Sequence, residues 1–320
     1  MYVNVATIIE GGVTAPEPDI LPLTEDSYLF YSGEFNLIFG DTESGKTWLC
    51  LAAVAEALKR GSAAVIDLDH NGAASLVKRL QDLGVEDRVL VDQQRFRLAE
   101  TADRIELKEV VNDLTVFEPD IVVIDSLGEV LPLFRFNSNN ADDFTVAHTE
   151  VIKPLTRCGA AVLVVDHLAK NTDSRQFGPT GTTAKSRAVG GTSIRVTGEE
   201  PFKPGEGGSA KLELYKDRHG GVRKQFPKSE PKPVVGTFTI TDDGGDLTYS
   251  INPGLTVSMA KQKAMNVEQA IADAGRLAEL VDGAEFDLRV RSVRYVLKCG
   301  QARAQRAIDA YKAQRTQLAS

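Results

Sequence analysis

The amino-acid sequence predicts an α/β fold in which a mainly parallel, twisted β-sheet is flanked by helices. Short apolar runs alternate along the chain with longer segments of helical spacing, which is the pattern of parallel strands connected by helices. A glycine-containing loop, GDTESGKT at 40–47, also lies directly between the apolar run 35–39 and the helical segment 48–58. We therefore expect a large α/β domain over 34–252, an irregular lead-in over 1–33 and a small helical domain over 263–320.

The individual elements are expected in the order in which their patterns occur. In the lead-in, Pro16, Pro18 and Pro22 interrupt any regular pattern. In the first part of the large domain, strands are expected at 63–68, 121–124 and 160–165, and helices at 73–83, 105–116 and 141–157. Residues 171–192 are rich in Gly, Thr and Ser and predict a long loop, a kind of segment that is usually functional. The remaining elements are expected to be strands at 193–197, 211–216, 234–241 and 247–251, a linker at 252–262 and helices within 263–314.

The loop at 40–47 matches the phosphate-binding pattern G-x-x-x-x-G-K-[ST]. Gly40 and Gly45 carry no Cβ and allow the backbone to wrap closely around phosphates. The N–H groups of the loop and of the first helical turn would point at the anion. Lys46 would reach the β- and γ-phosphates, and the Thr47 hydroxyl would ligate Mg²⁺. The residues expected to bind nucleotide are Gly40, Asp41, Thr42, Glu43, Ser44, Gly45, Lys46, Thr47 and Trp48.

Polar side chains end three of the predicted strands. Asp125 follows the β-branched run 121–124, and a carboxylate at the carboxyl end of a central strand faces the ligand crevice of such a sheet, where Asp125 would hold Mg²⁺. At the end of the second strand, Asp69 is favoured over Asp67 for orienting the lytic water, while a turn over 69–72 is a compatible interpretation. His167 ends a further strand and would sense the γ-phosphate; a purely structural histidine is the alternative.

Composition narrows the class of protein. The chain has 320 residues, of which 42% are hydrophobic and 26% charged, as in globular proteins. Cys50, Cys158 and Cys299 are far apart, which argues against a zinc site or a disulfide framework. The N-terminus has no basic n-region, and no apolar run is long enough to span a membrane. A cytoplasmic location is therefore expected.

Charge is distributed unevenly along the chain. The net charge is −8, which does not favour nucleic acid as a partner for the molecule as a whole. Residues 288–320 hold eight basic residues and one acidic residue, so their net charge is +7 and that of the rest is −15. Such a segment is either a nucleic-acid-binding tail or a basic face that contacts an acidic surface of the same protein or a neighbour.

The same C-terminal segment has the spacing of a helix-turn-helix. Residues 293–298 and 301–312 predict two helices separated by a tight turn that contains Gly300. The second helix carries Arg303 and Arg306, which would contact nucleic acid. An equally compatible interpretation is a helical hairpin that docks on the large domain or on a partner subunit.

Five segments, in this order, resemble the RecA-type ATPases, and among them the ring-forming branch of DnaB-like replicative helicases, RadA/KaiC-like proteins and plasmid RepA helicases. The resemblance covers roughly residues 30–250. It rests on GDTESGKT (40–47), IDLDHN (66–71), IVVIDS (121–126), VVDHLAK (164–170) and KDRHGG (216–221). It implies a RecA-like P-loop core that uses ATP and Mg²⁺, assembles as a ring or filament (a hexamer in this branch) and acts on DNA, single-stranded DNA above all, together with replication proteins.

The resemblance also implies roles for particular residues. Lys216 and Arg218 of KDRHGG would enter the nucleotide site of the next subunit and act in trans. His167 would couple the γ-phosphate to the DNA-binding loops. One such loop would be 171–192, and the other 126–141 with Phe134 and Phe136. The phosphate-backbone contacts expected in the first loop are Arg175, Lys185 and Arg187.

One departure from the family pattern affects the predicted activity. The family usually has a catalytic glutamate where this chain has Asp69 and His70, and alignment leaves either residue at that place. Aspartate is shorter by one methylene, so hydrolysis could be slow. The leading expectation is an ATP-hydrolysing helicase of replication or recombination. The alternatives are an ATP-dependent helicase loader or recombination mediator, and a nucleotide-switched DNA-binding regulator with little turnover.

Overall fold

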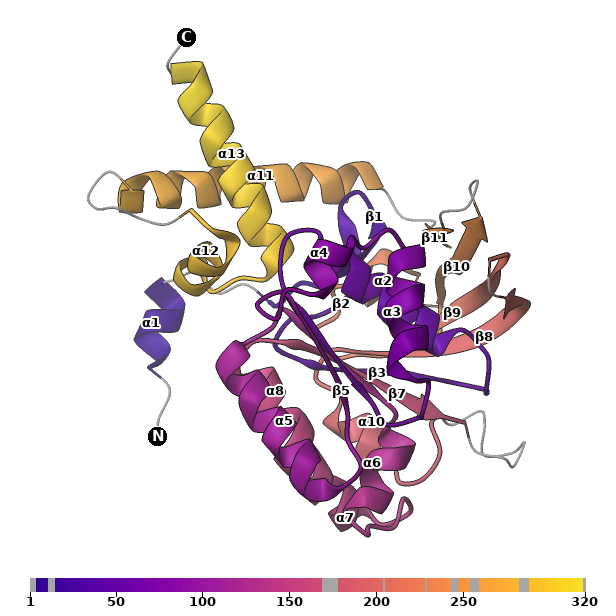
Figure 1. Cartoon of the computed structure of the whole chain (residues 1–320). Coiled ribbons are helices and arrows are strands. Elements are labelled where there is room, and N and C mark those ends of the chain that lie inside the picture. Colours follow the sequence, from indigo (N-terminus) through magenta and orange to yellow (C-terminus); the bar gives the residue numbers. More distant parts are fainter. Residues whose placement is uncertain are drawn as a thin grey trace.

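The computed structural model describes residues 4–10, 15–168, 178–203, 205–227, 229–242, 247–253, 259–281 and 288–318. Within these residues, nine strands form one sheet in the order β11-β10-β9-β8-β3-β7-β6-β4-β5 (Figure 1). The strands from β8 to β5 are parallel, and β9, β10 and β11 continue the sheet as an antiparallel meander. The strands are β3 (Phe35–Gly40), β4 (Ala63–Asp67), β5 (Phe96–Glu100), β6 (Ile121–Asp125), β7 (Ala161–His167), β8 (Thr192–Lys203), β9 (Gly207–Asp217), β10 (Val234–Asp242) and β11 (Leu247–Pro253).

Helices cover both faces of the sheet and bury two apolar clusters. On one face, α2, α3 and α4 pack over residues such as Ile38 and Val65. On the other, α5, α6, α7 and α8 pack over residues such as Leu37 and Val122. Neighbouring strand residues alternate between the two clusters because side chains alternate across a sheet. The helices are α2 (Lys46–Leu58), α3 (Ala73–Asp82), α4 (Asp87–Leu90), α5 (Arg104–Phe117), α6 (Leu127–Leu133), α7 (Ala141–Ala147), α8 (Lys153–Arg157) and α10 (Ala184–Ala188).

The strand order places the loop at 40–47, Asp69, Asp125 and His167 at one edge of the sheet. β7 lies between the loop-bearing strand β3 and the Asp125 strand β6, and β4 follows β6. All four strands are parallel, so their carboxyl ends meet at the same edge. The α/β fold and the mainly parallel sheet predicted from the sequence are confirmed.

The N-terminal segment is more ordered than the sequence predicted. A short helix, α1 (Val5–Glu10), is followed by an antiparallel hairpin of β1 (Ile20–Thr24) and β2 (Ser27–Phe30). Ile20, Leu23 and Phe30 are buried in the same cluster as α2. The expectation of an irregular lead-in over 1–33 is therefore wrong for the hairpin: the prolines lie before or within an edge pairing that tolerates them.

Several elements differ from their predicted extent. The expected helix over 141–157 is interrupted by a π-helical stretch, His148–Ile152, which is followed by Pro154 in the first turn of α8; proline donates no hydrogen bond to the turn before it. β5 and α4 were not predicted, because the burial of β5 is only partial and no continuous apolar run marks it. β8 is much longer than the expected strand at 193–197, and its outer end is largely exposed.

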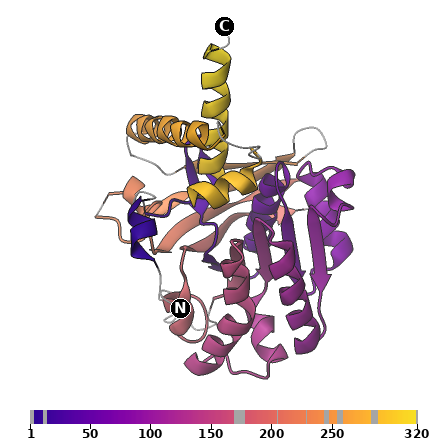
Figure 2. The ribbon, with the colours of Figure 1, turned by 90° about the vertical axis from the view of Figure 1, so that its left-hand side faces the viewer.

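The C-terminal helices form a cluster of their own at one end of the α/β core (Figure 2). They are α11 (Met259–Val281), α12 (Val290–Leu297) and α13 (Gln301–Leu318). Their shared core includes Leu277, Val293 and Ile308. Polar contacts join the cluster to the core: the guanidinium of Arg294 lies 2.6 Å from the Asp120 carboxylate, and the Gln301 N–H donates to Asp19 at 2.7 Å. In the described part of the chain, every helix is too short or too polar to cross a membrane.

Candidate nucleotide-binding site

The loop between β3 and α2 has the form of a phosphate cradle. It ends at Gly45, whose φ of +92° lies in the left-handed region, a conformation that glycine adopts without strain. A cavity of about 680 Å³ opens beside the loop. Its walls are formed by all residues from Asp41 to Trp48, together with side chains from the ends of the neighbouring strands.

Lys46 is buried within the loop that it serves. Its ammonium group donates to the carbonyl oxygens of Gly40 at 3.3 Å and Asp41 at 2.5 Å. Burial lowers the pKa of Lys46, and the charges of Asp125, Asp69 and Asp41 oppose that shift. The ammonium thus rests on loop carbonyls within reach of the cavity, where an anionic ligand would be a stronger partner.

Asp125 and Thr47 meet at the floor of the cavity. The Thr47 hydroxyl donates to Asp125 Oδ2 at 2.7 Å. Asp125 Oδ1 is buried and has no hydrogen-bond partner among the described residues, and the same holds for the Ser44 hydroxyl. Burial raises the pKa of Asp125, and the nearby Asp69 and Asp67 raise it further. A buried carboxylate with an unpartnered oxygen fits a divalent cation, because the cation supplies both the missing partner and the missing positive charge.

Asp69 and His167 lie close together in the lining of the same cavity. His167 Nε2 lies 3.8 Å from Asp69 Oδ1, and the Ser126 hydroxyl is 3.4 Å from the same oxygen. Both side chains line the cavity, whereas the exposed His70 is not among the residues that line it. Asp67 instead accepts hydrogen bonds from the backbone of Asn71 and Gly72 and stabilises the turn after β4. The geometry therefore favours Asp69 as the carboxylate that faces a bound nucleotide.

Other residues of the cavity were not predicted from the sequence. Asn71 donates to Asp125 at 3.4 Å, and Arg79 of α3 lies over the Trp48 ring, with its guanidinium carbon 5.3 Å from the ring centroid. The long hairpin of β8 and β9 also reaches the loop, and the Phe202 ring occupies the space that a Cβ on Gly45 would need. Arg79 follows Asp67 by 12 residues, and no local pattern connects it with the loop. The one signal for Arg79 in the sequence is that it is an arginine on α3, the helix that follows β4.

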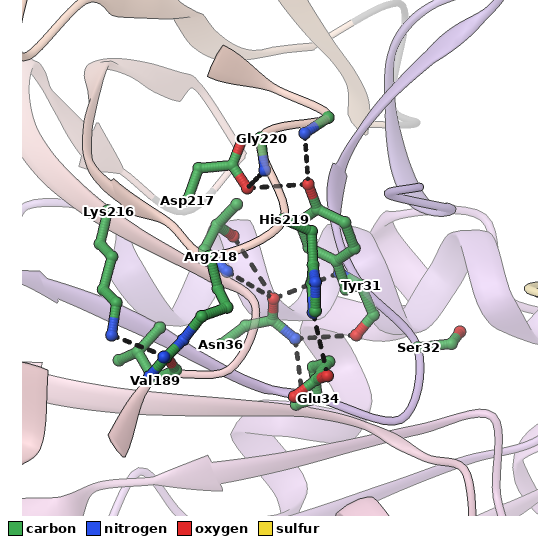
Figure 3. Close-up of polar contacts among 12 residues, drawn as sticks. Tyr31, Ser32, Glu34, Asn36, Val189, Lys216, Asp217, Arg218, His219 and Gly220 are labelled. Carbon is green, nitrogen blue, oxygen red and sulfur yellow. Dashed lines mark hydrogen bonds and ion pairs between the residues drawn. The ribbon is translucent and has the colours of Figure 1, made fainter. Parts of the chain in front are cut away.

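The KDRHGG segment forms a tight turn at the end of β9 (Figure 3). Asp217 accepts hydrogen bonds from the backbone of Gly220, Val222 and Arg223, and from the Tyr31 hydroxyl at 2.8 Å. His219 pairs with Glu34 at 3.0 Å. The turn is thus anchored to the segment just before β3.

Lys216 and Arg218 both extend toward Val189, the residue that follows α10 (Figure 3). The Lys216 ammonium donates to the carbonyl oxygens of Ser186, Arg187 and Val189 at 2.6–3.1 Å, and Arg218 donates to those of Arg187 and Val189. Burial lowers the pKa of Lys216, and the adjacent charge of Arg218 adds to the effect. Two cations here neutralise the carbonyl end of a short helix. Neither side chain lines the nucleotide cavity of its own chain.

The predicted nucleic-acid contacts have different environments. Lys185 is fully buried and pairs with the fully buried Asp166 at 2.7 Å, so the expectation of a phosphate contact at Lys185 is wrong for this structure. Arg187 is exposed on the same helix and remains a candidate. Arg175 lies outside the described residues. Phe134 is buried in the core rather than presented on a loop, and Phe136 packs against its ring with the centroids 5.4 Å apart.

The two arginines of the predicted recognition helix face the interior. Arg303 forms a bidentate pair with the buried Asp273 of α11 at 2.7 and 3.0 Å, so its guanidinium is committed to helix packing. Arg306 lines a cavity between α13 and the core that also includes Tyr28 and Glu56. The expectation that α13 presents Arg303 to nucleic acid is therefore wrong, and the docked helical hairpin is the interpretation that fits.

Comparison with known proteins agrees with the geometry of the cavity. A family model described as an AAA domain matches residues 27–173, which hold the loop, Asp69, Asp125 and His167. This is a RecA-like P-loop core. The chain is similar to the DNA repair protein RAD51 homolog 4 of Mus musculus, with 27% identity over 165 residues, or 47% of this chain and 50% of that protein.

Two bacterial proteins named Protein RecA are also similar to this chain. That of Nitratidesulfovibrio vulgaris is 30% identical over 221 residues, or 65% of this chain and 52% of that protein. That of Bacteroides thetaiotaomicron is 25% identical over 276 residues, or 78% of this chain and 79% of that protein. The chain thus spans about half the length of the mouse and N. vulgaris relatives.

Proposed function

We propose that this protein is an ATP-hydrolysing motor of the RecA-like class that acts on DNA, and that its nucleotide lies between subunits as in the DnaB-like and RepA helicases. One observation carries the proposal: the phosphate-binding loop, Asp125, Asp69 and His167, which come from four parallel strands, converge on one cavity. The similarity to proteins named for RecA and for DNA repair supports DNA as the substrate on which the motor acts.

The residues of the cavity have distinct roles in this proposal. The loop N–H groups and Lys46 hold the phosphates, with Lys46 exchanging its two carbonyl partners for phosphate oxygens. Thr47 and Asp125 would hold Mg²⁺, which neutralises charge on the phosphates. Asp69 orients a water molecule and accepts its proton as the water oxygen bonds to the γ-phosphorus and the bond to the β-phosphate oxygen breaks. ADP and inorganic phosphate are the products.

Contacts behind the cavity connect it to the segment expected to bind DNA. The Asp166 carboxylate accepts from the His167 N–H at 2.9 Å and from the Lys185 ammonium at 2.7 Å. Lys185 belongs to α10, whose Ser186 and Arg187 carbonyl oxygens accept hydrogen bonds from Lys216 and Arg218. A change at His167 can therefore reach α10 through a buried ion pair, and α10 in turn contacts the two residues proposed to act in trans on the next subunit.

The test is steady-state ATP turnover with and without single-stranded DNA, in the wild type and in an Asp69→Ala variant. We expect turnover that rises with single-stranded DNA and falls by roughly 10²-fold or more in the variant, the contribution of a positioned base. His70→Ala is the matched control and should retain activity. Unchanged turnover in Asp69→Ala would remove Asp69 from the proposed chemistry.

Assays on the same protein can distinguish two other functions from that of a helicase. A helicase loader or recombination mediator would hydrolyse ATP but would not displace a strand by itself, so strand-displacement assays separate it from a helicase. A nucleotide-switched regulator would show negligible turnover, which the shorter carboxylate at Asp69 permits, and would bind specific duplex sites.

A further inference from the structure

A second cavity lies at the opposite edge of the sheet, between the α/β core and the C-terminal helices. Its volume is about 1300 Å³. It is lined by Ser62, Asp120 and Gly159, which stand just before β4, β6 and β7. These are the amino ends of the strands whose carboxyl ends hold the nucleotide cavity. We call this second cavity the basic groove.

The lining of the basic groove is strongly positive on an acidic chain. It contains eight basic residues and two acidic ones, a net charge of +6 against −8 for the whole protein. The acidic residues are Glu118 and Asp120. The basic residues are Arg60, Arg95, Arg157, Arg289, Arg291, Arg294, Lys298 and Lys312.

Some of these cations have structural partners, and others face outward. Arg95 donates to the carbonyl oxygen of Gly61 at 2.6 Å, and Arg294 pairs with Asp120, so both hold the walls together. Arg60, Arg157 and Lys298 are exposed and form no ion pair with any residue that the structure describes. They are the cations available to a ligand.

Arg291 adds a fourth cation to this outward-facing group. It pairs with Glu118, but the two side chains are 72% and 44% exposed. A surface pair of this kind contributes little to stability, and a phosphate group can take the place of the carboxylate.

An exposed aromatic side chain lies in the same groove. Tyr295 of α12 lines it and is 86% exposed, more than any other large hydrophobic side chain among the described residues. Packing does not explain it, since the buried face of α12 is formed by Val293 and its neighbours. A cavity lined by both cations and an exposed aromatic ring suits a single strand, because unpaired bases stack on the ring while their phosphates contact the cations.

We propose that the basic groove binds single-stranded nucleic acid, with phosphates on Arg60, Arg157, Arg291 and Lys298 and a base stacked on Tyr295. A duplex would explain the charge but not the exposed ring, because its bases are already stacked. An acidic protein segment would likewise leave Tyr295 without a role. This site goes beyond the proposed function. Binding there requires neither ATP in the nucleotide cavity nor a helix-turn-helix arrangement of the C-terminal helices.

The experiment measures binding of a fluorescently labelled oligothymidylate of about 20 nucleotides, a length that spans such a site, to the full-length protein as salt is varied. The double variant Arg157→Gln/Lys298→Gln should lower the slope of log affinity against log salt by about 1.4, since a single strand gives roughly 0.7 per phosphate contact. Lys78→Gln/Lys203→Gln is the matched control, because these lysines are 70% and 61% exposed elsewhere. It should leave the slope unchanged.

Tyr295 is tested with the same probe. Tyr295→Ala should weaken binding roughly tenfold, and Tyr295→Phe should restore it, because stacking needs the ring and not the hydroxyl. Comparison of oligothymidylate with oligouridylate then distinguishes DNA from RNA as the source of the strand.

The inference about the basic groove and the proposal about the nucleotide cavity can be refuted independently. A Lys46→Ala variant should bind the probe through the groove as well as the wild type does, so the absence of ATP turnover would leave this inference intact. Equal salt slopes in the groove and control variants would overturn it. Tighter binding of a duplex with no effect of Tyr295→Ala, or equal competition by polyglutamate, would also overturn it, in favour of duplex DNA or of an acidic protein partner.

Discussion

Replacement of Lys185 by methionine tests the buried ion pair behind the nucleotide cavity. Lys185 and Asp166 are both 0% exposed, and their charged atoms are 2.7 Å apart. Methionine keeps the length of the side chain and removes the charge, so the Asp166 carboxylate would lose its ionic partner in an apolar environment. Breaking a buried pair in this way costs about 3–5 kcal/mol, which corresponds to a fall in melting temperature on the order of 10 °C for a chain of this size.

The loss should depend on pH in a defined direction. Burial raises the pKa of Asp166, and the charge of Lys185 opposes that rise, so Lys185→Met should raise the pKa further. Below this raised pKa the carboxyl is neutral and needs no cation. The difference in the free energy of unfolding between wild type and variant should therefore reach its full value above the raised pKa of Asp166. It should shrink as the pH falls through that pKa.

Thermal and urea unfolding at several pH values provide the measurement. Asp166→Asn/Lys185→Met, which removes both charges, should regain most of the loss. Arg187→Met is the matched control, since Arg187 is exposed on the same helix; its effect should stay within about 0.5 kcal/mol. A loss below about 1 kcal/mol in Lys185→Met, independent of pH, would refute the claim that this pair is buried and desolvated.

Three further predictions concern the two cavities. Lys46→Ala should abolish detectable binding of ATP in calorimetry while leaving the melting temperature near that of the wild type, because burial of the ammonium disfavours its charge; binding of ATP with unchanged affinity would contradict its role. The Mg²⁺-dependent part of ATP affinity should decline at a higher pH than for an ordinary aspartate when the solution is acidified, since the pKa of Asp125 is raised and its protonated form is a poor ligand; a loss confined to pH values near 3.8 would not fit. Asp120→Ala removes the acceptor of Arg294 and of the Ser62 N–H and should destabilise the fold by about 1–2 kcal/mol in urea unfolding, whereas an effect below the error of that measurement would show that α12 is held by other contacts.

The residues that could be predicted from sequence are those in which a local pattern coincides with a strand end. The loop at 40–47, Asp125 and His167 follow buried apolar runs, and parallel strands bring their ends together by topology alone. Asp69 was preferred over Asp67 by its position nearer the edge, and the structure places it in the cavity while Asp67 caps the following turn.

The residues that could not be predicted depend on contacts between distant segments. Lys185 belongs to a polar, glycine-rich stretch that predicted an exposed cation, and nothing local marks Asp166, 19 residues earlier, as its buried partner. Arg303 was assigned to DNA by the helix-turn-helix spacing, but Asp273 lies on a helix 30 residues away. In both cases the sequence identifies a cationic side chain, but the tertiary structure determines whether that cation contacts a buried carboxylate or an outside ligand.

The central claim is that Lys46 of one subunit and Arg218 of the next complete a single nucleotide site. The most direct measurement is ATP turnover in equimolar mixtures of Lys46→Ala and Arg218→Ala subunits, each variant being inactive alone. Random assembly pairs an intact Lys46 with an intact Arg218 at about one quarter of the heterologous interfaces. We predict recovery of about that fraction of wild-type turnover. Full activity of Arg218→Ala by itself, or a mixture as inactive as its components, would contradict the shared site.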